Sequence, residues 1–85
     1  MKKSGAPIVG YIVHATRDDR RSKLRVREFL VGISDQADAA GAVISAFPEL
    51  DDGYHVEASI GITKENAVKL ALSPGEIRKG EETEL

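Results

Sequence analysis

Eighty-five residues without a cysteine make one small domain, and they exclude a disulfide scaffold or a thiolate metal site. Hydrophobic residues are 41% of the chain and charged residues 31%, proportions typical of a folded domain rather than a disordered one. The net charge of −2 hides a division: residues 1–27 sum to +6 (eight basic, two acidic) and residues 28–85 to −8 (four basic, twelve acidic). We therefore expect electrostatics to matter for what this protein binds.

The first expected element is a strand at residues 8–15, after a loose polar tail at residues 1–6. The apolar run from Ile8 to Val13 is nearly continuous, which favours a strand buried on both faces. The run follows a basic start, as in a signal peptide, but it is short and broken by Pro7 and Gly10. It is also too short to span a membrane, so we expect a cytoplasmic protein without membrane association.

A polar stretch at residues 16–23 predicts a solvated loop that joins the first strand to a second, antiparallel one at residues 24–33. The apolar alternation of this second strand changes parity between Val26 and Phe29. A β-bulge near Arg27-Glu28 would restore one apolar face, and we predict one there. The alternative is a central strand that is apolar on both faces.

Two helices and a third strand follow. Ser34 or Asp35 caps a helix predicted over residues 35–47, and Pro48 ends it. Its apolar residues recur at helical spacing: Ala40, Val43, Ile44 and Phe47. Strict alternation predicts a strand at residues 54–62, with the apolar residues from Tyr54 to Ile62 all on one face. Thr63 then caps a second helix predicted over residues 64–72.

The C-terminal segment leaves two alternatives open. Ser73-Pro74-Gly75-Glu76 has the form of a capping box that opens a short helix, but it equally fits a turn before an edge strand at residues 76–79. Residues 81–85 are expected to be a disordered acidic tail. The whole chain, residues 1–85, is thus predicted to be one α+β domain in the order β-β-α-β-α with a possible short final element. Its three- to four-stranded, mostly antiparallel sheet is packed by two helices, which we expect on one face.

The strongest candidate site is a basic stretch around the predicted loop 17–27. Guanidinium groups bind phosphates and carboxylates bidentately, and a two-stranded ribbon with a basic loop fits a nucleic-acid groove. The alternative is a solvated loop whose charges pair with nearby acids or with the acidic half of the chain, which the sequence pI of about 5.6 favours. The candidate residues for binding a partner or nucleic acid are Arg17, Arg20, Arg21, Lys23, Arg25 and Arg27.

Three weaker candidates remain. His14 and His55 lie in strands that pairing would bring together, with Glu57 on the same face as His55. The acidic stretch at residues 49–53 lacks the ligand spacing of a calcium loop. The last four residues, Glu82-Thr83-Glu84-Leu85, have the form of a peptide that adds to a sheet edge. None of these patterns matches a catalytic, metal or cofactor motif, so we expect no enzyme, no cofactor and no metal.

The charge division and the small core lead to one functional expectation and one alternative. We expect a small non-enzymatic interaction module that binds a protein partner or a second copy of itself, since a small core gains from association. The alternative is a nucleic-acid-binding domain that uses the basic loop at residues 17–27.

Overall fold

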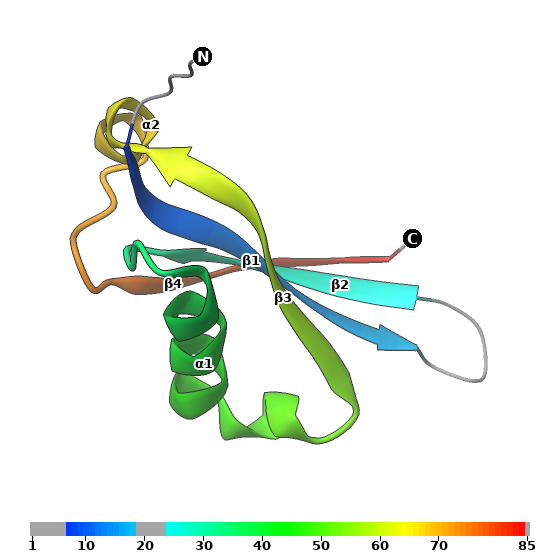
Figure 1. The fold of residues 1–85 in the computed structure, drawn as a ribbon. Coiled ribbons are helices and arrows are strands. Elements are labelled where there is room, and N and C mark those ends of the chain that lie inside the picture. The colour runs from blue at the N-terminus through cyan, green and yellow to red at the C-terminus, as the bar shows by residue number, and fades with distance from the viewer. Residues whose placement is uncertain (1–6, 19–23, 85) are drawn as a thin grey trace, which may run out of the picture.

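The computed structural model describes residues 7–18 and 24–84, which form one four-stranded antiparallel sheet and two α-helices (Figure 1). The strands lie in the order β3-β1-β2-β4, so the N-terminal hairpin is central and the two later strands are the edges. The predicted α+β class and element order are confirmed, with a full fourth strand. The elements are β1 (Ile8–Asp18), β2 (Leu24–Val31), α1 (Gln36–Ala46), the 3-10 turn η1 (Pro48–Asp51), β3 (Tyr54–Thr63), α2 (Lys64–Lys69) and β4 (Ile77–Glu84).

The two helices pack on opposite faces of the sheet, so the prediction that they share one face is wrong. Neighbouring residues of β1 and β2 point to opposite faces, and apolar residues of both parities offer each helix a surface. On one face, Val13 and Phe29 are buried with Val43 of α1, and the rings of Phe29 and Phe47 are 5.2 Å apart. On the other face, α2 covers one end, and a smaller cluster contains Ile62, Ala67, Leu72 and, partly buried, Val9, Ile12 and Leu30. Burial of one side chain the size of Phe29 contributes about 1.5–3 kcal/mol.

The predicted β-bulge in the second strand is wrong. Strand β2 pairs with β1 without a register shift from Val31, opposite Tyr11, to Leu24, opposite Asp18. The alternative, a central strand apolar on both faces, is correct because helices pack on the two faces near Phe29 and Leu30. The extra residue lies in the edge strand β4, between Lys79 and Glu82.

A second irregularity divides strand β3 between the two faces. The register against β1 shifts between Ala58 and Ile60, which places an extra residue at Ser59. Ala58 is therefore buried in the α1 cluster, whereas Ile62 is buried in the α2 cluster and Ile60 is 52% exposed. The prediction of one apolar face along the whole of this strand is wrong beyond Ala58.

The hairpin is longer than predicted, because residues 16–18 continue β1 instead of entering a loop. Pairing with β2 and β3 supplies backbone partners for this segment although it carries no large apolar side chain. The C-terminal residues 81–84, predicted to be a disordered tail, likewise pair with β2 as part of β4. Leu85 lies outside the described residues.

The segment between α2 and β4 is a turn rather than a third helix. The second helix ends at Lys69, not at residue 72, and Ala71 follows with φ = 53°. The Arg78 guanidinium, on β4, stabilises this early end of the helix. It donates hydrogen bonds to the carbonyl oxygens of Leu70 and Ala71 at 2.7 and 2.8 Å. The edge-strand alternative is therefore correct, and β4 starts directly after this turn.

Gly32 anchors the same turn to the end of β2. Its N–H donates to the Glu76 carbonyl oxygen at 2.8 Å, and its own carbonyl oxygen accepts from the Gly75 N–H at 2.7 Å. A Cβ at Gly32 would collide with the Ser73 carbonyl oxygen, so only glycine permits this approach. Half of the predicted capping box also forms, since the Ser73 N–H donates to the Glu76 carboxylate at 2.9 Å.

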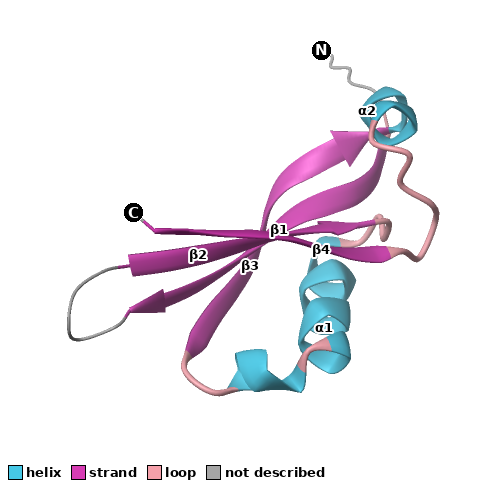
Figure 2. Cartoon of the chain, turned by 180° about the vertical axis from the view of Figure 1, so that it is seen from behind, coloured by secondary structure: helices cyan, strands magenta, loops and turns pink. Residues whose placement is uncertain are grey.

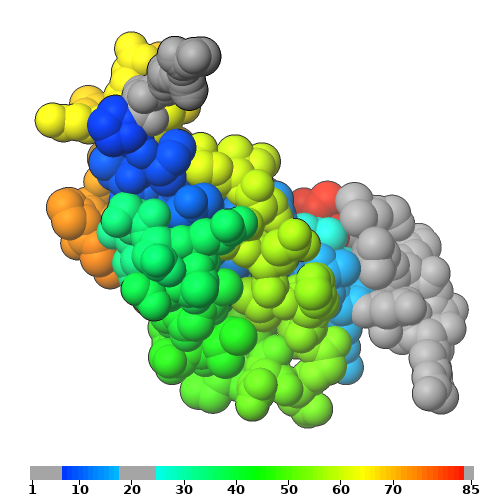
Figure 3. All heavy atoms as spheres, in the orientation of Figure 1, coloured from blue at the N-terminus to red at the C-terminus, as the bar shows by residue number. Residues whose placement is uncertain are grey.

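The far end of the hairpin extends beyond both helices. Seen from behind, α1 and η1 lie beside the lower part of the sheet and α2 lies at its upper end (Figure 2). The space-filling view shows blue and cyan atoms of β1 and β2 beyond the yellow-green surface of β3 (Figure 3). The molecule is accordingly elongated, with extents of 45 × 26 × 22 Å. At this end, the described part of the sheet has no helix packed on the face opposite α1.

Candidate binding surface

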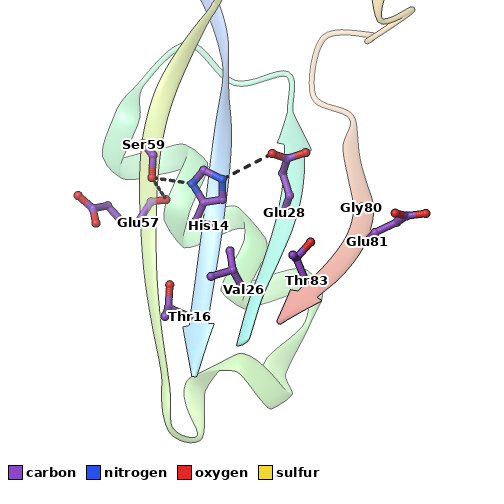
Figure 4. Close-up of a pocket in the computed structure, with 9 residues that line it drawn as sticks. All are labelled: His14, Thr16, Val26, Glu28, Glu57, Ser59, Gly80, Glu81 and Thr83. Atoms are coloured by element: carbon purple, nitrogen blue, oxygen red, sulfur yellow. Dashed lines mark hydrogen bonds and ion pairs between the residues drawn. The ribbon is translucent and has the colours of Figure 1, made fainter. Parts of the chain in front are cut away.

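The face of the sheet opposite α1 forms an open groove of about 760 Å³ at the hairpin end, and we call it the acidic groove (Figure 4). All four strands contribute to it. Its lining residues are His14, Thr16, Val26, Glu28, Glu57, Ser59, Gly80, Glu81 and Thr83. Three of these described lining residues carry carboxylates and none of them is lysine or arginine, so the described part of the groove is negative at neutral pH.

His14 occupies the centre of the acidic groove. Strand pairing places it opposite Glu28 of β2 and Glu57 of β3. Its Nε2 lies 3.5 Å from Glu28 Oε2, and its Nδ1 lies 2.9 Å from the hydroxyl oxygen of Ser59, as Figure 4 shows. Ser59 lies two residues after Glu57 in β3, so strand alternation places it on the same face as His14. Side chains of three neighbouring strands are thereby held in one array.

This array has the residue types of a nucleophile, a base and a carboxylate. The Ser59 hydroxyl lies 3.3 Å from the Glu57 carbonyl oxygen of its own strand, to which it can donate. His14 Nδ1 and the Ser59 hydroxyl share a hydrogen bond whose donor is set by the tautomer of the imidazole. Glu28 is 51% exposed, so solvent screens its charge. The array therefore orients polar side chains across the groove.

The other carboxylates of the acidic groove lie toward its sides. The side chains of Glu57 and Glu81 point outward from the two edge strands in Figure 4, away from His14. Glu57 pairs with His55, whose Nε2 is 3.6 Å from its Oε1, and both side chains are largely exposed. Val26 and the backbone of Gly80 lie between Glu57 and Glu81 and form the less polar part of the surface. Acidic groups thus flank a nearly flat strip of sheet.

The two predicted histidines lie on adjacent strands, but each is paired with a different glutamate. Thr16, not His14, stands opposite His55 in the register of β1 and β3. No group of three or more histidine and carboxylate side chains that could hold a metal ion occurs within residues 7–18 and 24–84, including the acidic stretch at 49–53. The strands bring the histidines to one face without joining them in one site.

Three of the six predicted basic residues, Arg17, Arg25 and Arg27, lie at the hairpin end on the face of the sheet that also carries α1. We call this surface the arginine face. Arg17 and Arg25 are cross-strand partners, and both are exposed. The Arg17 guanidinium lies over the Tyr54 ring, 5.6 Å from its centroid. Arg27 is more enclosed. The remaining three predicted residues, Arg20, Arg21 and Lys23, lie outside the described residues.

Arg27 is occupied by contacts within the chain. Its guanidinium donates to the Gly80 carbonyl oxygen at 3.2 Å and lies 3.7 Å from a Glu82 carboxylate oxygen. Pairing with the acidic half of the chain is the alternative expected from the sequence for the basic residues, and Arg27 makes such a pair. The residues of the arginine face that project from the sheet are Arg17 and Arg25.

Sequence reasoning missed the acidic groove. The alternation of strand β3 placed His55, Glu57 and Ser59 on one face, which supplied part of the signal. The other part needed the pairing of β1 with both β2 and β3, and the extension of β4 over Glu81 and Thr83. Because residues 81–85 were predicted to be a disordered tail, they were not placed in the sheet. The groove could therefore not be predicted from the sequence.

A second hollow, of about 620 Å³, lies beside α2 and is mostly apolar. Ile8, Val9 and Leu72 line it, together with Val68, which is 74% exposed. One cationic residue, Lys64, lies at this hollow, and no carboxylate does among its described lining residues. The two hollows therefore differ in chemistry, one acidic and the other apolar.

Comparison with protein-family models, with curated protein sequences and with solved structures finds no match to this chain. Among the described residues, neither helix has the length and apolar character needed to cross a bilayer. Function therefore has to be argued from the surface itself.

Proposed function

We propose that this protein is a small non-enzymatic interaction module that binds a basic segment of a partner protein in the acidic groove. The observation that carries the proposal is the composition of the groove, whose described lining residues include three glutamates and no lysine or arginine. Cationic side chains of a partner would meet carboxylates on both sides of the strip. Electrostatic complementarity of this kind sets specificity and association rate more than raw affinity.

The shape of the groove supports an extended partner segment. It crosses the sheet without enclosing its contents, which suits a chain laid over strands better than a small molecule, since small ligands are buried in concave sites. The array of Ser59, His14 and Glu28 presents hydroxyl, imidazole and carboxylate groups in fixed positions. Holding these groups in place lowers the entropy lost on binding.

Fluorescence anisotropy with a labelled peptide of alternating arginine and serine tests the proposal. The variant Glu28→Gln/Glu57→Gln/Glu81→Gln keeps the shape of the groove but removes its charge. We expect its dissociation constant to rise about tenfold, because three exposed pairs at about 0.2–1 kcal/mol each sum to that factor.

The matched control is Asp38→Asn/Glu49→Gln/Glu65→Gln, which changes net charge equally at exposed positions on α1, η1 and α2. We expect it to bind the peptide nearly as the unmodified protein does. Equal loss of affinity in both variants would show that the peptide senses net charge only, and the groove would not be the binding site.

Nucleic-acid binding is the second candidate function, supported by the arginine face. Arg17 and Arg25 stand side by side next to Tyr54, and arginine beside an aromatic ring suits both phosphates and bases. Anisotropy with single-stranded DNA and RNA at several salt concentrations tests it. Binding that weakens linearly in log salt and is lost in Arg17→Gln/Arg25→Gln would favour this function over the first.

A further inference from the structure

The hairpin end of the sheet carries opposite charges on its two faces. Arg17 and Arg25 project from the face that carries α1. Their neighbours along the strands point the other way, and that face holds the carboxylates of Glu28, Glu57 and Glu81. The same strands thus present a positive surface and a negative surface, separated only by the thickness of one sheet.

The charged side chains next to each surface keep the two surfaces opposite in charge. On the arginine face, Lys79 lies 5.6 Å from the centroid of the Phe47 ring and adds a positive charge at the edge of α1. Glu82 is engaged by Arg27 on that face, and strand pairing places Glu84 opposite Arg25, so the four described basic residues there outnumber the two glutamates. On the opposite face the imidazoles of His14 and His55 are the only basic groups paired with the groove carboxylates among the described residues.

We propose that the protein assembles with itself by placing the arginine face of one copy on the acidic groove of the next. The inference rests on the proposed function, since it names a second copy as the source of the basic segment. The charge distribution of the hairpin end argues for this partner, because each molecule carries both complementary surfaces on one stretch of sheet. Sheets that pack face to face lie about 10 Å apart, a distance that long arginine and glutamate side chains bridge.

The sign of the charges also decides the symmetry of the contact. A two-fold symmetric pair would place arginine on arginine or glutamate on glutamate, which repel. The contact is therefore heterologous, with a different surface used on each copy, and it leaves one surface open at each end of the assembly. Species larger than dimers are expected as concentration rises. Salt loosens them, because exposed charge pairs are screened beyond about 10 Å at 0.1 M ionic strength.

Sedimentation velocity over a range of protein concentrations and salt tests the contact with two charge-reversed variants. One is Glu28→Lys/Glu57→Lys/Glu81→Lys, which makes both faces positive. The other is Arg17→Glu/Arg25→Glu, which makes both faces negative and leaves Arg27 unchanged. We expect each variant alone to sediment as a monomer and an equimolar mixture of the two to form a complex.

Two controls distinguish the effect of where the charges lie from the effects of unfolding and of a changed net charge. The variant Glu28→Gln/Glu57→Gln/Glu81→Gln, which alters side-chain shape little, is expected to weaken self-association about tenfold. The variant Lys64→Glu/Lys69→Glu changes charge on the exposed side of α2 by the same amount as the arginine variant. We expect it to assemble as the unmodified protein does, and circular dichroism reports whether each variant is folded.

The outcomes also distinguish this inference from the proposed function. An unmodified protein that stays monomeric at low salt and high concentration, or a mixture of reversed variants that fails to associate, would overturn self-assembly. If that protein still binds the arginine–serine peptide through the groove glutamates, the proposed function stands and the partner is another protein. If the peptide does not bind either, both proposals are wrong.

Discussion

The two ends of the sheet differ in what covers them. At the end that carries α1 and α2, both faces are packed, and buried side chains such as Phe29 and Ile62 lie under helices. At the hairpin end no helix covers the described acidic groove, and the exposed residues are charged. The difference implies that folding free energy is concentrated at the packed end, whereas the hairpin end is available for binding. Substitutions at the two ends should therefore separate stability from affinity.

The largest effect is expected at the packed end, from Phe29→Ala. Phe29 is 1% exposed and touches the Phe47 ring, so truncation leaves a cavity that costs about 3–5 kcal/mol. Three residues away on the same strand, Val26 lines the open groove, and Val26→Thr should cost less than about 1 kcal/mol. Urea unfolding followed by circular dichroism measures both. Similar losses in the two variants would mean that the ends do not differ in stability as proposed.

A pair of glycine substitutions gives the next largest difference, with opposite signs. A Cβ at Gly80 would stand 2.6 Å from the Glu28 carbonyl oxygen, so Gly80→Ala pushes β4 away from β2 and should destabilise by about 1–3 kcal/mol. No atom lies within 4 Å of a Cβ at Gly41, which is inside α1, so Gly41→Ala should stabilise by about 0.5–1 kcal/mol. Thermal unfolding measures the pair. A stabilising Gly80→Ala would contradict the described approach of the two strands.

The smallest of the three effects concerns pH and the link between α2 and β4. The Ser73 N–H, and after it the Arg78 guanidinium, lower the pKa of Glu76 below its ordinary value. A carboxylate with a lowered folded-state pKa contributes stability that is present above its unfolded-state pKa and is lost as pH falls through the folded-state value. Arg78→Met removes one cause of the shift, so the pKa of Glu76 should rise and less stability should be lost on acidification.

NMR titration of the Glu76 side chain in both proteins measures this difference, and amide exchange in α2 reports the loosened link. Lys64→Met on the outer side of α2 is the control, because the described partners of Glu76 are Ser73 and Arg78, and Arg78 is the side-chain donor to the carbonyl oxygens at the end of the helix. An unchanged Glu76 titration in Arg78→Met would show that Arg78 does not influence this carboxylate.

The sequence predicted the elements with local signals and missed those that depend on pairing. The caps at Ser34 or Asp35 and at Thr63 act within a few residues and predicted the two helix starts to within one residue, and Pro48 predicted the end of the first helix. Strand β4 was predicted only as one of two alternatives, over residues 76–79. Its continuation over residues 80–84 has no large apolar side chain and forms because β2 offers it an edge, which no local pattern reveals. The acidic groove depends on that same pairing. The basic residues were visible in the sequence, but the contacts of Arg27 with Gly80 and Glu82 on β4 were not, because they depend on the pairing of β2 with β4.

The most direct measurement of the central claim is the map of backbone amide shifts in NMR spectra as the arginine–serine peptide is added. The account predicts that the shifts concentrate on groove residues of all four strands, around His14, Glu28, Glu57 and Glu81, and fade in the variant whose three groove glutamates are replaced by glutamine. Shifts that concentrate instead on the arginine face or beside α2, or that do not occur, would contradict the acidic groove as the binding surface.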